Sequence, residues 1–170
     1  PEAVNCIHLL LLTGCRLSEI QTLKWDYVDL YAGVLRLPDS KTGAKLVTIG
    51  KAAVEVLKDI PKVTDNPYVI TGRIEGQHLT DMQRPWRRLR KRAKLEDVRI
   101  HDLRHSFASD ALQLGEDLPM IGRLLGHTQV QTTARYAHLK TDPIKAAADK
   151  VADAIASALA HPLRKATHQS

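Results

Sequence analysis

The sequence has little cysteine, few aromatic residues and no long apolar run. Its 170 residues include 2 Cys, 2 Trp, 4 Tyr and 1 Phe, so the core must be mostly aliphatic. Two thiols cannot complete a tetrahedral zinc site, and Cys6 and Cys15 are expected to be buried and reduced. The leucine run at residues 9–12 is far shorter than the roughly 18 residues that cross a bilayer, and it lacks the features of a signal peptide. We therefore expect a cytoplasmic protein with no membrane partner.

Positive charge is concentrated in one part of the chain. Lys and Arg total 25 against 19 Asp and Glu, a formal charge of +6, and residues 84–99 alone account for this excess. On a helix, four of these side chains share one face by their i, i+3, i+4, i+7 spacing: Arg84, Arg87, Arg88 and Lys91. Trp86 and Leu89 face elsewhere and are expected to be buried. Such a face is often simply solvated, but it also suits a polyanionic partner, which the charge alone does not identify.

The apolar spacing predicts a mainly α-helical domain with a small β-hairpin or sheet. Helices are expected at residues 2–13, 51–60, 102–114, 119–125 and about 143–160, several of them ending at a glycine or before a proline. Two short strands, at residues 34–37 and 46–49, flank a turn-rich stretch at 39–43. No repeat and no long linker divides the chain, so one domain is expected.

The polar residues that could carry chemistry lie beside the apolar stripes or at the ends of the predicted elements. They are Arg16, Lys41, His101, Arg104, His127 and Tyr136.

Each of these residues also has an ordinary explanation. Arg16 could form a helix-start ion pair with Glu19, and a single tyrosine is usually a packing residue. His101 and His105 have the spacing of a metal-binding pair, but no third ligand is spaced nearby, so we expect no metal site.

Together, the same residues match one kind of chemistry. Two arginines provide charged, planar anion donors, and two histidines can exchange protons near neutral pH. A lysine can deliver a proton, and a tyrosine hydroxyl can act as a nucleophile. There is no carboxylate cluster suited to magnesium. The set indicates phosphoryl transfer through a covalent intermediate, with no cofactor.

Four motifs resemble the catalytic signatures of the tyrosine recombinase (phage integrase) family. They are TGCRLSEIQTLKW, SKTG, HDLRHSFAS and LLGHTQVQTTARYAH, and they extend in the order of that family from Thr13 to His138. The resemblance implies the mainly α catalytic-domain fold of these enzymes. It also implies double-stranded DNA as substrate, and site-specific recombination or DNA integration of the kind used by mobile elements.

The resemblance assigns Tyr136 as the nucleophile, which would form a 3′-phosphotyrosyl bond and release a 5′-hydroxyl. Arg16, Arg104 and His127 would hold the non-bridging phosphate oxygens as negative charge develops.

Three further roles follow from the same resemblance. His101 would help to remove the phenol proton, and Lys41 would protonate the departing 5′ oxygen. Glu19 would orient or support Arg16. Neither a metal ion nor ATP is part of this scheme.

The resemblance also sets expectations for the organisation of the protein. Residues 1–170 would form a catalytic domain, and the N-terminal DNA-binding domain that usually accompanies it is absent from this chain. Four protomers would assemble on DNA, with a monomer expected in isolation. The helix at about 143–160 could pack onto its own domain or onto a neighbouring protomer, and the sequence leaves both open.

Three alternative functions compete with recombination. A type IB topoisomerase has related chemistry but reseals the same strand. A DNA-binding module that has lost catalysis is a second, although every expected catalytic position is occupied. A helix-turn-helix regulator that uses the basic segment at 84–94 is a third, and it leaves Arg16, Lys41 and Tyr136 unexplained.

Overall fold

The computed structural model describes residues 1–38, 43–126, 133–134, 136 and 148–155. Lys41, His127 and most of the helix predicted at 143–160 lie outside these residues, although 148–155 are helical and exposed. The chain divides into a unit at Pro1–Ala137 and a second unit at His138–Ser170. Within the described part, no helix has the length and apolar character needed to cross a bilayer.

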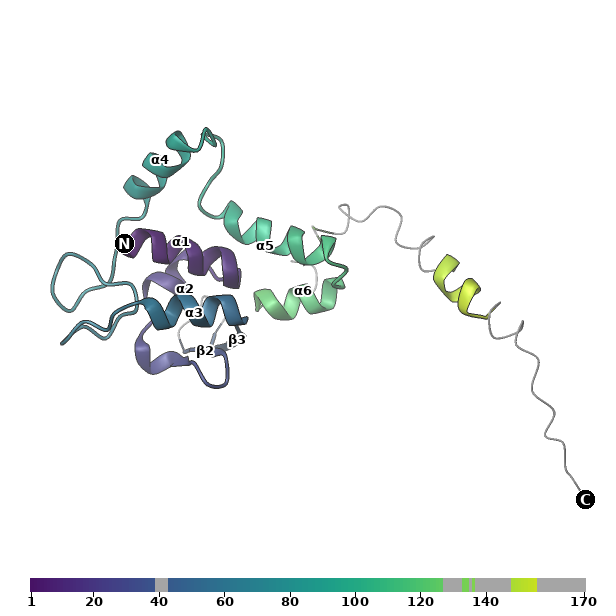
Figure 1. The fold of residues 1–170 in the computed structure, drawn as a ribbon, viewed down its shortest axis with the longest axis horizontal. Coiled ribbons are helices and arrows are strands. Elements are labelled where there is room, and N and C mark those ends of the chain that lie inside the picture. Colours follow the sequence, from purple (N-terminus) through teal and green to yellow (C-terminus); the bar gives the residue numbers. More distant parts are fainter. Residues whose placement is uncertain (39–42, 127–132, 135, 137–147, 156–170) are drawn as a thin grey trace, which may run out of the picture. The chain divides into compact units, whose positions relative to one another are not determined.

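The first unit contains helices and a small sheet, as the sequence predicts (Figure 1). Its elements are α1 (Glu2–Thr13), α2 (Leu17–Gln21), the 3₁₀ turn η1 (Trp25–Tyr27), β1 (Val28–Asp29), β2 (Val34–Leu37), β3 (Lys45–Thr48), α3 (Lys51–Asp59), α4 (Gln83–Arg92), α5 (Asp102–Gln113) and α6 (Leu118–Leu125).

The sheet is antiparallel with the order β1-β2-β3. The predicted hairpin is confirmed as β2 and β3, with Leu35 opposite Val47 in the register and both side chains buried. Strand β1 was not predicted, because two residues are too few to show an alternating pattern.

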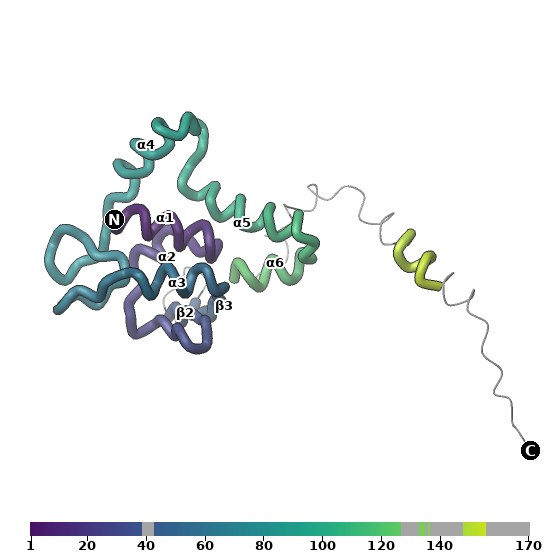
Figure 2. Tube along the Cα trace, in the orientation of Figure 1, coloured from purple at the N-terminus to yellow at the C-terminus, as the bar shows by residue number. Residues whose placement is uncertain are grey.

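Helix α1 lies in the middle of the first unit, between α5 and α3 (Figures 1 and 2). The larger apolar core joins α1 to α2, the sheet and α3. A smaller core lies between α5 and α6, where Ala108, Leu112, Ile121 and Leu125 surround Tyr136. Tyr136, the predicted nucleophile, therefore belongs to the apolar core between these two helices.

The basic helix forms where expected. The four residues of its predicted basic face are exposed, and Trp86 is buried, with its Nε1 donating to the carbonyl of Val98 at 3.1 Å. The prediction that Leu89 is buried is wrong, because its side chain is 42% exposed. Helix α4 buries side chains only near its start, at Met82 and Trp86, so its later turns remain in solvent.

Gly14 ends α1 and allows α5 and α6 to approach it. Its φ of 62° is left-handed, and its amide donates to the carbonyl of Leu10. A Cβ at this position would lie 2.6 Å from Cδ1 of Phe107 and 2.9 Å from Cδ2 of Leu125. A side chain at Gly14 would therefore force apart the three helix segments that meet here.

We predict that Gly14→Ala lowers the free energy of unfolding by about 2–4 kcal/mol, the sum of left-handed strain and overpacking. Urea unfolding measures this change. Gly115→Ala is the matched control, because Gly115 also has a positive φ, of 96°, but a Cβ there meets nothing within 4 Å. The control should lose only about 1–2 kcal/mol. Equal losses in both variants would contradict the close approach at Gly14.

Candidate active site

Arg16 occupies the junction between α1 and α2, where both its backbone and its side chain are fixed by one carboxylate. Arg16 is the N-cap residue of α2, and Glu19 lies in the first turn of that helix. Glu19 Oε2 accepts the Arg16 backbone N–H at 2.8 Å, and Oε1 accepts from Arg16 Nη1 at 2.9 Å. The sequence analysis considered a helix-start ion pair between Arg16 and Glu19 and also a role for Glu19 in orienting Arg16. Both expectations involve this one contact.

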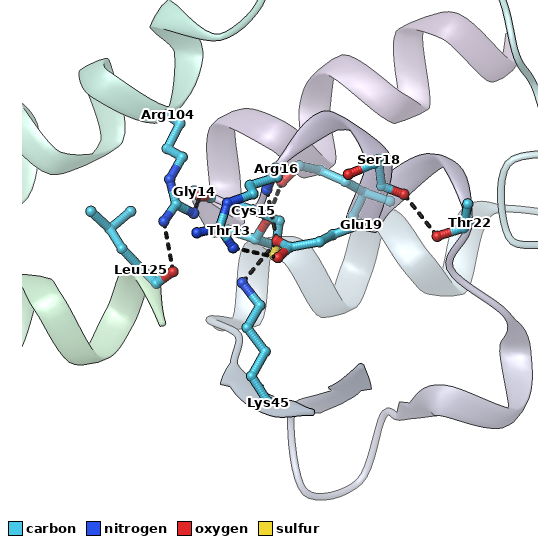
Figure 3. Close-up of polar contacts among 11 residues, drawn as sticks. Thr13, Gly14, Cys15, Arg16, Ser18, Glu19, Thr22, Lys45, Arg104 and Leu125 are labelled. Atoms are coloured by element: carbon cyan, nitrogen blue, oxygen red, sulfur yellow. Dashed lines mark hydrogen bonds and ion pairs between the residues drawn. The ribbon is translucent and has the colours of Figure 1, made fainter. Parts of the chain in front are cut away.

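A second cation, Lys45, binds the same carboxylate from the sheet. Its Nζ lies 2.8 Å from Glu19 Oε2, and the lysine side chain is only 9% exposed (Figure 3). The sequence analysis missed Lys45. Its position two residues before buried Val47 was the available signal, since alternate residues of a strand share a face. The side chain of Lys45 also lies against Gly126, where a Cβ would come within 2.9 Å of Cδ.

The charge on Glu19 is maintained despite its burial. Burial acts to raise the pKa of Glu19, but hydrogen bonds and charge from Lys45 and Arg16 outweigh it and hold the pKa below its usual value. Glu19 therefore remains ionised at neutral pH, and it anchors two cations at one edge of the site.

Arg104 is a buried cation between two helix ends. It extends from α5, and its Nη1 donates to the carbonyl of Gly14 at the end of α1. Its Nη2 donates to the carbonyl of Leu125, the last residue of α6, at 2.8 Å. Carbonyls at helix C-termini carry partial negative charge, which favours a guanidinium at this position. Arg104 therefore links the ends of α1 and α6.

The two arginines that the sequence singled out converge on one place. Figure 3 shows the side chains of Arg16 and Arg104 directed at the junction between α1 and α2. Burial lowers the pKa of Arg104, the neighbouring charge of Arg16 lowers it further, and Glu19 and Tyr136 act in the opposite direction. Two neighbouring positive charges favour a bound anion, and guanidinium groups can donate two hydrogen bonds to the oxygens of a phosphate.

Tyr136 is buried, and its hydroxyl contacts a histidine of α5. The tyrosine is 5% exposed and packs against α5 and α6. Its Oη lies 2.7 Å from Nδ1 of His105. His101, the N-cap residue of α5, is exposed and meets the His105 ring edge-to-face, with 5.1 Å between ring centroids.

His105 is the second residue whose role the sequence analysis missed. It was considered only as a possible metal ligand with His101. The available signal was its position one helical turn after His101, which places both rings on the same side of α5. In the part of the chain that the structure describes, no three His, Cys, Asp or Glu side chains form a metal-binding group.

The first unit thus brings together residues that are distant in the sequence. Arg16, Glu19 and Arg104 lie at the end of α1, and Tyr136 is within electrostatic reach of Arg104. His101 lies beside the ring that contacts Tyr136. Two guanidinium groups and a phenol are the groups that a phosphate-binding site with a nucleophile requires. Lys41 and His127, which the sequence also predicts for this site, lie outside the described residues.

Comparison with known proteins identifies the family. The profile of the phage integrase family matches residues 3–142. A shufflon-specific DNA recombinase of Escherichia coli is 31% identical over 135 residues, covering 78% of this chain and 34% of that protein. Tyrosine recombinase XerC of Thermodesulfovibrio yellowstonii is 31% identical over 175 residues, covering 94% of this chain and 54% of that protein.

Solved structures agree with the family match. The XerA recombinase structure has a TM-score of 0.64 and 26% identity, covering 88% of this chain and 61% of that one. The catalytic domain of bacteriophage HP1 integrase has a TM-score of 0.63 and 25% identity, covering 85% of this chain and 79% of that one. The chain therefore belongs to the phage integrase, or tyrosine recombinase, family and has the catalytic-domain fold. It spans between about a third and a half of the length of the two curated relatives.

We predict that Glu19→Gln destabilises the protein by about 3 kcal/mol at pH 7, because it leaves two cations facing a neutral amide. The pKa of Glu19 is lowered on folding, so its contribution is complete above the unfolded pKa of about 4.3 and is lost as pH falls through the folded pKa. Urea unfolding at several pH values should show the two proteins converging below pH 4. Glu55→Gln, at an exposed ion pair with Lys58, is the control and should change stability by less than about 1 kcal/mol. A constant difference between Glu19→Gln and wild type down to low pH would contradict this account of the site.

Proposed function

We propose that this chain is the catalytic domain of a site-specific DNA recombinase, which cleaves and rejoins strands through a 3′-phosphotyrosyl intermediate. The observation that carries the proposal is the convergence of Arg16 and Arg104 at one junction, with Tyr136 within electrostatic reach. The family membership supports the same chemistry.

The first step is in-line attack of the Tyr136 oxygen on a DNA phosphodiester. A free phenol has a pKa of about 10, so only about one molecule in a thousand is ionised at pH 7. Forming the phenolate at this pH therefore costs about 4 kcal/mol of free energy. Arg16 and Arg104 would stabilise the negative charge that develops on the non-bridging oxygens. In other phosphoryl-transfer enzymes, a single well-placed arginine raises the reaction rate by about 10³–10⁵-fold.

The remaining roles are carried by three residues assigned through the family motifs. His101 would assist removal of the phenol proton, His127 would bind a non-bridging oxygen, and Lys41 would protonate the departing 5′ oxygen. The phosphotyrosyl bond retains the energy of the bond that was broken. Rejoining to another 5′-hydroxyl therefore requires no ATP.

Double-stranded DNA is the proposed partner. The XerH recombinase, at 25% identity and a TM-score of 0.68 over 86% of this chain, was solved bound to its difH substrate in a post-cleavage complex. The exposed basic face of α4 is proposed to contact the DNA backbone. Strand exchange would require two duplexes and four protomers, with the helix predicted at 143–160 packing either in cis or in trans.

The alternatives account for fewer of the observations. A type IB topoisomerase would use similar chemistry, but the curated relatives are named recombinases. A DNA-binding module without catalysis, including a helix-turn-helix regulator, has no use for the Arg16–Glu19–Lys45 cluster or for a tyrosine beside Arg104.

The covalent step predicts an adduct that survives denaturation. A library of nicked duplexes with random sequence around the nick lets the unknown target be selected, because cleavage beside the nick releases a short strand and traps the protein. We expect the wild-type chain to give SDS-resistant adducts whose DNA can be sequenced. Tyr136→Phe should give none, whereas Tyr31→Phe, at a fully exposed tyrosine, should behave as wild type. Adducts from Tyr136→Phe, or their absence from the wild-type chain, would refute the proposal.

The proposed DNA contact of α4 predicts a change in salt dependence. Replacing both Arg87 and Arg88 by Ala should lower the slope of log K against log salt concentration by about 1.8, since each lost phosphate contact removes about 0.9. Fluorescence anisotropy with a random duplex measures this slope. The control replaces Lys51 and Lys58 on α3, which removes the same charge from another exposed helix. Equal slopes for the two double variants would argue against α4 as the contact.

A further inference from the structure

His105 is the ring that holds the hydroxyl of the proposed nucleophile. Its Nδ1 lies 2.7 Å from Tyr136 Oη, and the two ring centroids are 5.9 Å apart. This separation of heavy atoms is within the range of a good hydrogen bond. A general base must lie within this distance of the proton that it removes. His105 meets this geometric requirement without any movement of α5.

The backbone and the packing fix both partners of this contact. His105 is the fourth residue of α5, next to Arg104, whose guanidinium is anchored to the ends of α1 and α6. Tyr136 is buried against α5 and α6, and its amide donates to the carbonyl of Thr133 at 3.0 Å. The distance between Nδ1 and Oη therefore depends on the core of the domain rather than on exposed side chains.

His105 has charged neighbours of both signs on α5. Arg104 precedes it in the chain, and the His101 ring meets it edge-to-face. Asp102, a carboxylate in the first turn of the same helix, pairs with Arg99, whose Nη2 lies 2.9 Å from Oδ1 and whose Nε lies 3.3 Å from Oδ2, and it also attracts a charged His105. A neutral imidazole has one unprotonated nitrogen, which can accept the phenol proton.

We propose that His105 Nδ1 is the direct proton acceptor for Tyr136 in the cleavage reaction. The proton moves from Oη to Nδ1 as the bond between Oη and phosphorus forms. The bond between phosphorus and the 5′ oxygen breaks, and its electron pair remains on that oxygen, which takes a proton from a separate donor. His101, whose ring meets that of His105 edge-to-face, would then assist removal of the phenol proton through His105. This inference rests on the proposed function.

The test separates activation of the nucleophile from protonation of the leaving group. The DNA is a nicked duplex selected by the wild-type chain, in two forms with oxygen or sulfur at the bridging 5′ position. A thiolate leaves without a proton, so sulfur rescues loss of a leaving-group donor but not loss of a base at Tyr136. His105→Asn retains a polar group near Nδ1 but cannot take up the proton.

We expect His105→Asn to slow adduct formation by about 10²–10⁴-fold on both substrates, the usual range for loss of a general base. Lys41→Ala should be slow on the oxygen substrate and restored by sulfur. A His105→Asn variant within threefold of wild type, or one rescued by sulfur, would overturn the inference. The inference would also be overturned if His101→Asn, and not His105→Asn, slowed adduct formation on both the oxygen and the sulfur substrate.

A measurement on the unaltered chain keeps the inference testable if His105→Asn fails to fold. Nitrogen NMR of histidine-labelled protein reports which ring nitrogen carries the proton. We expect His105 to be neutral, with the proton on Nε2 and an unprotonated, hydrogen-bonded Nδ1. A proton on Nδ1 at neutral pH would contradict the inference. This readout needs no DNA, so it remains decisive even if the wild-type chain forms no adduct, a result that would refute the proposed function alone.

Discussion

The buried guanidinium of Arg104, bonded to the carbonyls of Gly14 and Leu125, is the interaction on which the site depends. It joins the C-terminal ends of α1 and α6, where unpaired carbonyls and helix dipoles provide partial negative charge. Because Gly14 also begins the turn to Arg16, the same contact sets the position of the second arginine. Packing of the core and placement of the proposed phosphate site are therefore the same structural constraint.

Glu19 holds two cations, Arg16 and Lys45, close to each other with a single negative charge. It binds Arg16 through both backbone and side chain, and it binds Lys45 from β3. Glu19 also acts favourably on Arg104, which donates to the carbonyls of Gly14 and Leu125. Among the described residues, the cluster holds three cations and one carboxylate, and a phosphate diester is a suitable anion to complete it.

Much of the fold could be predicted from the sequence, because apolar stripes ending at Gly14, Gly115 and Gly126 define helices locally. The residue types of the site were also recognisable, since Arg16, Arg104 and Tyr136 occur in family motifs. The contacts of Lys45 and His105 were not, because they join residues 26 and 31 positions apart. Strand alternation at Lys45 and helical spacing at His105 indicate which face each residue occupies, but their partners depend on how α5, α6 and β3 pack, which a single sequence does not give.

The central claim is that Arg16 and Arg104 form a single phosphate site beside the ring of Tyr136. The most direct test is a crystal structure of Tyr136→Phe bound to the DNA duplex that the wild-type chain selects. The account predicts one phosphate whose non-bridging oxygens lie within hydrogen-bond distance of both guanidinium groups, with its phosphorus facing the edge of the substituted ring. A phosphate bound by only one arginine, or bound away from the junction of α1 and α2, would contradict it.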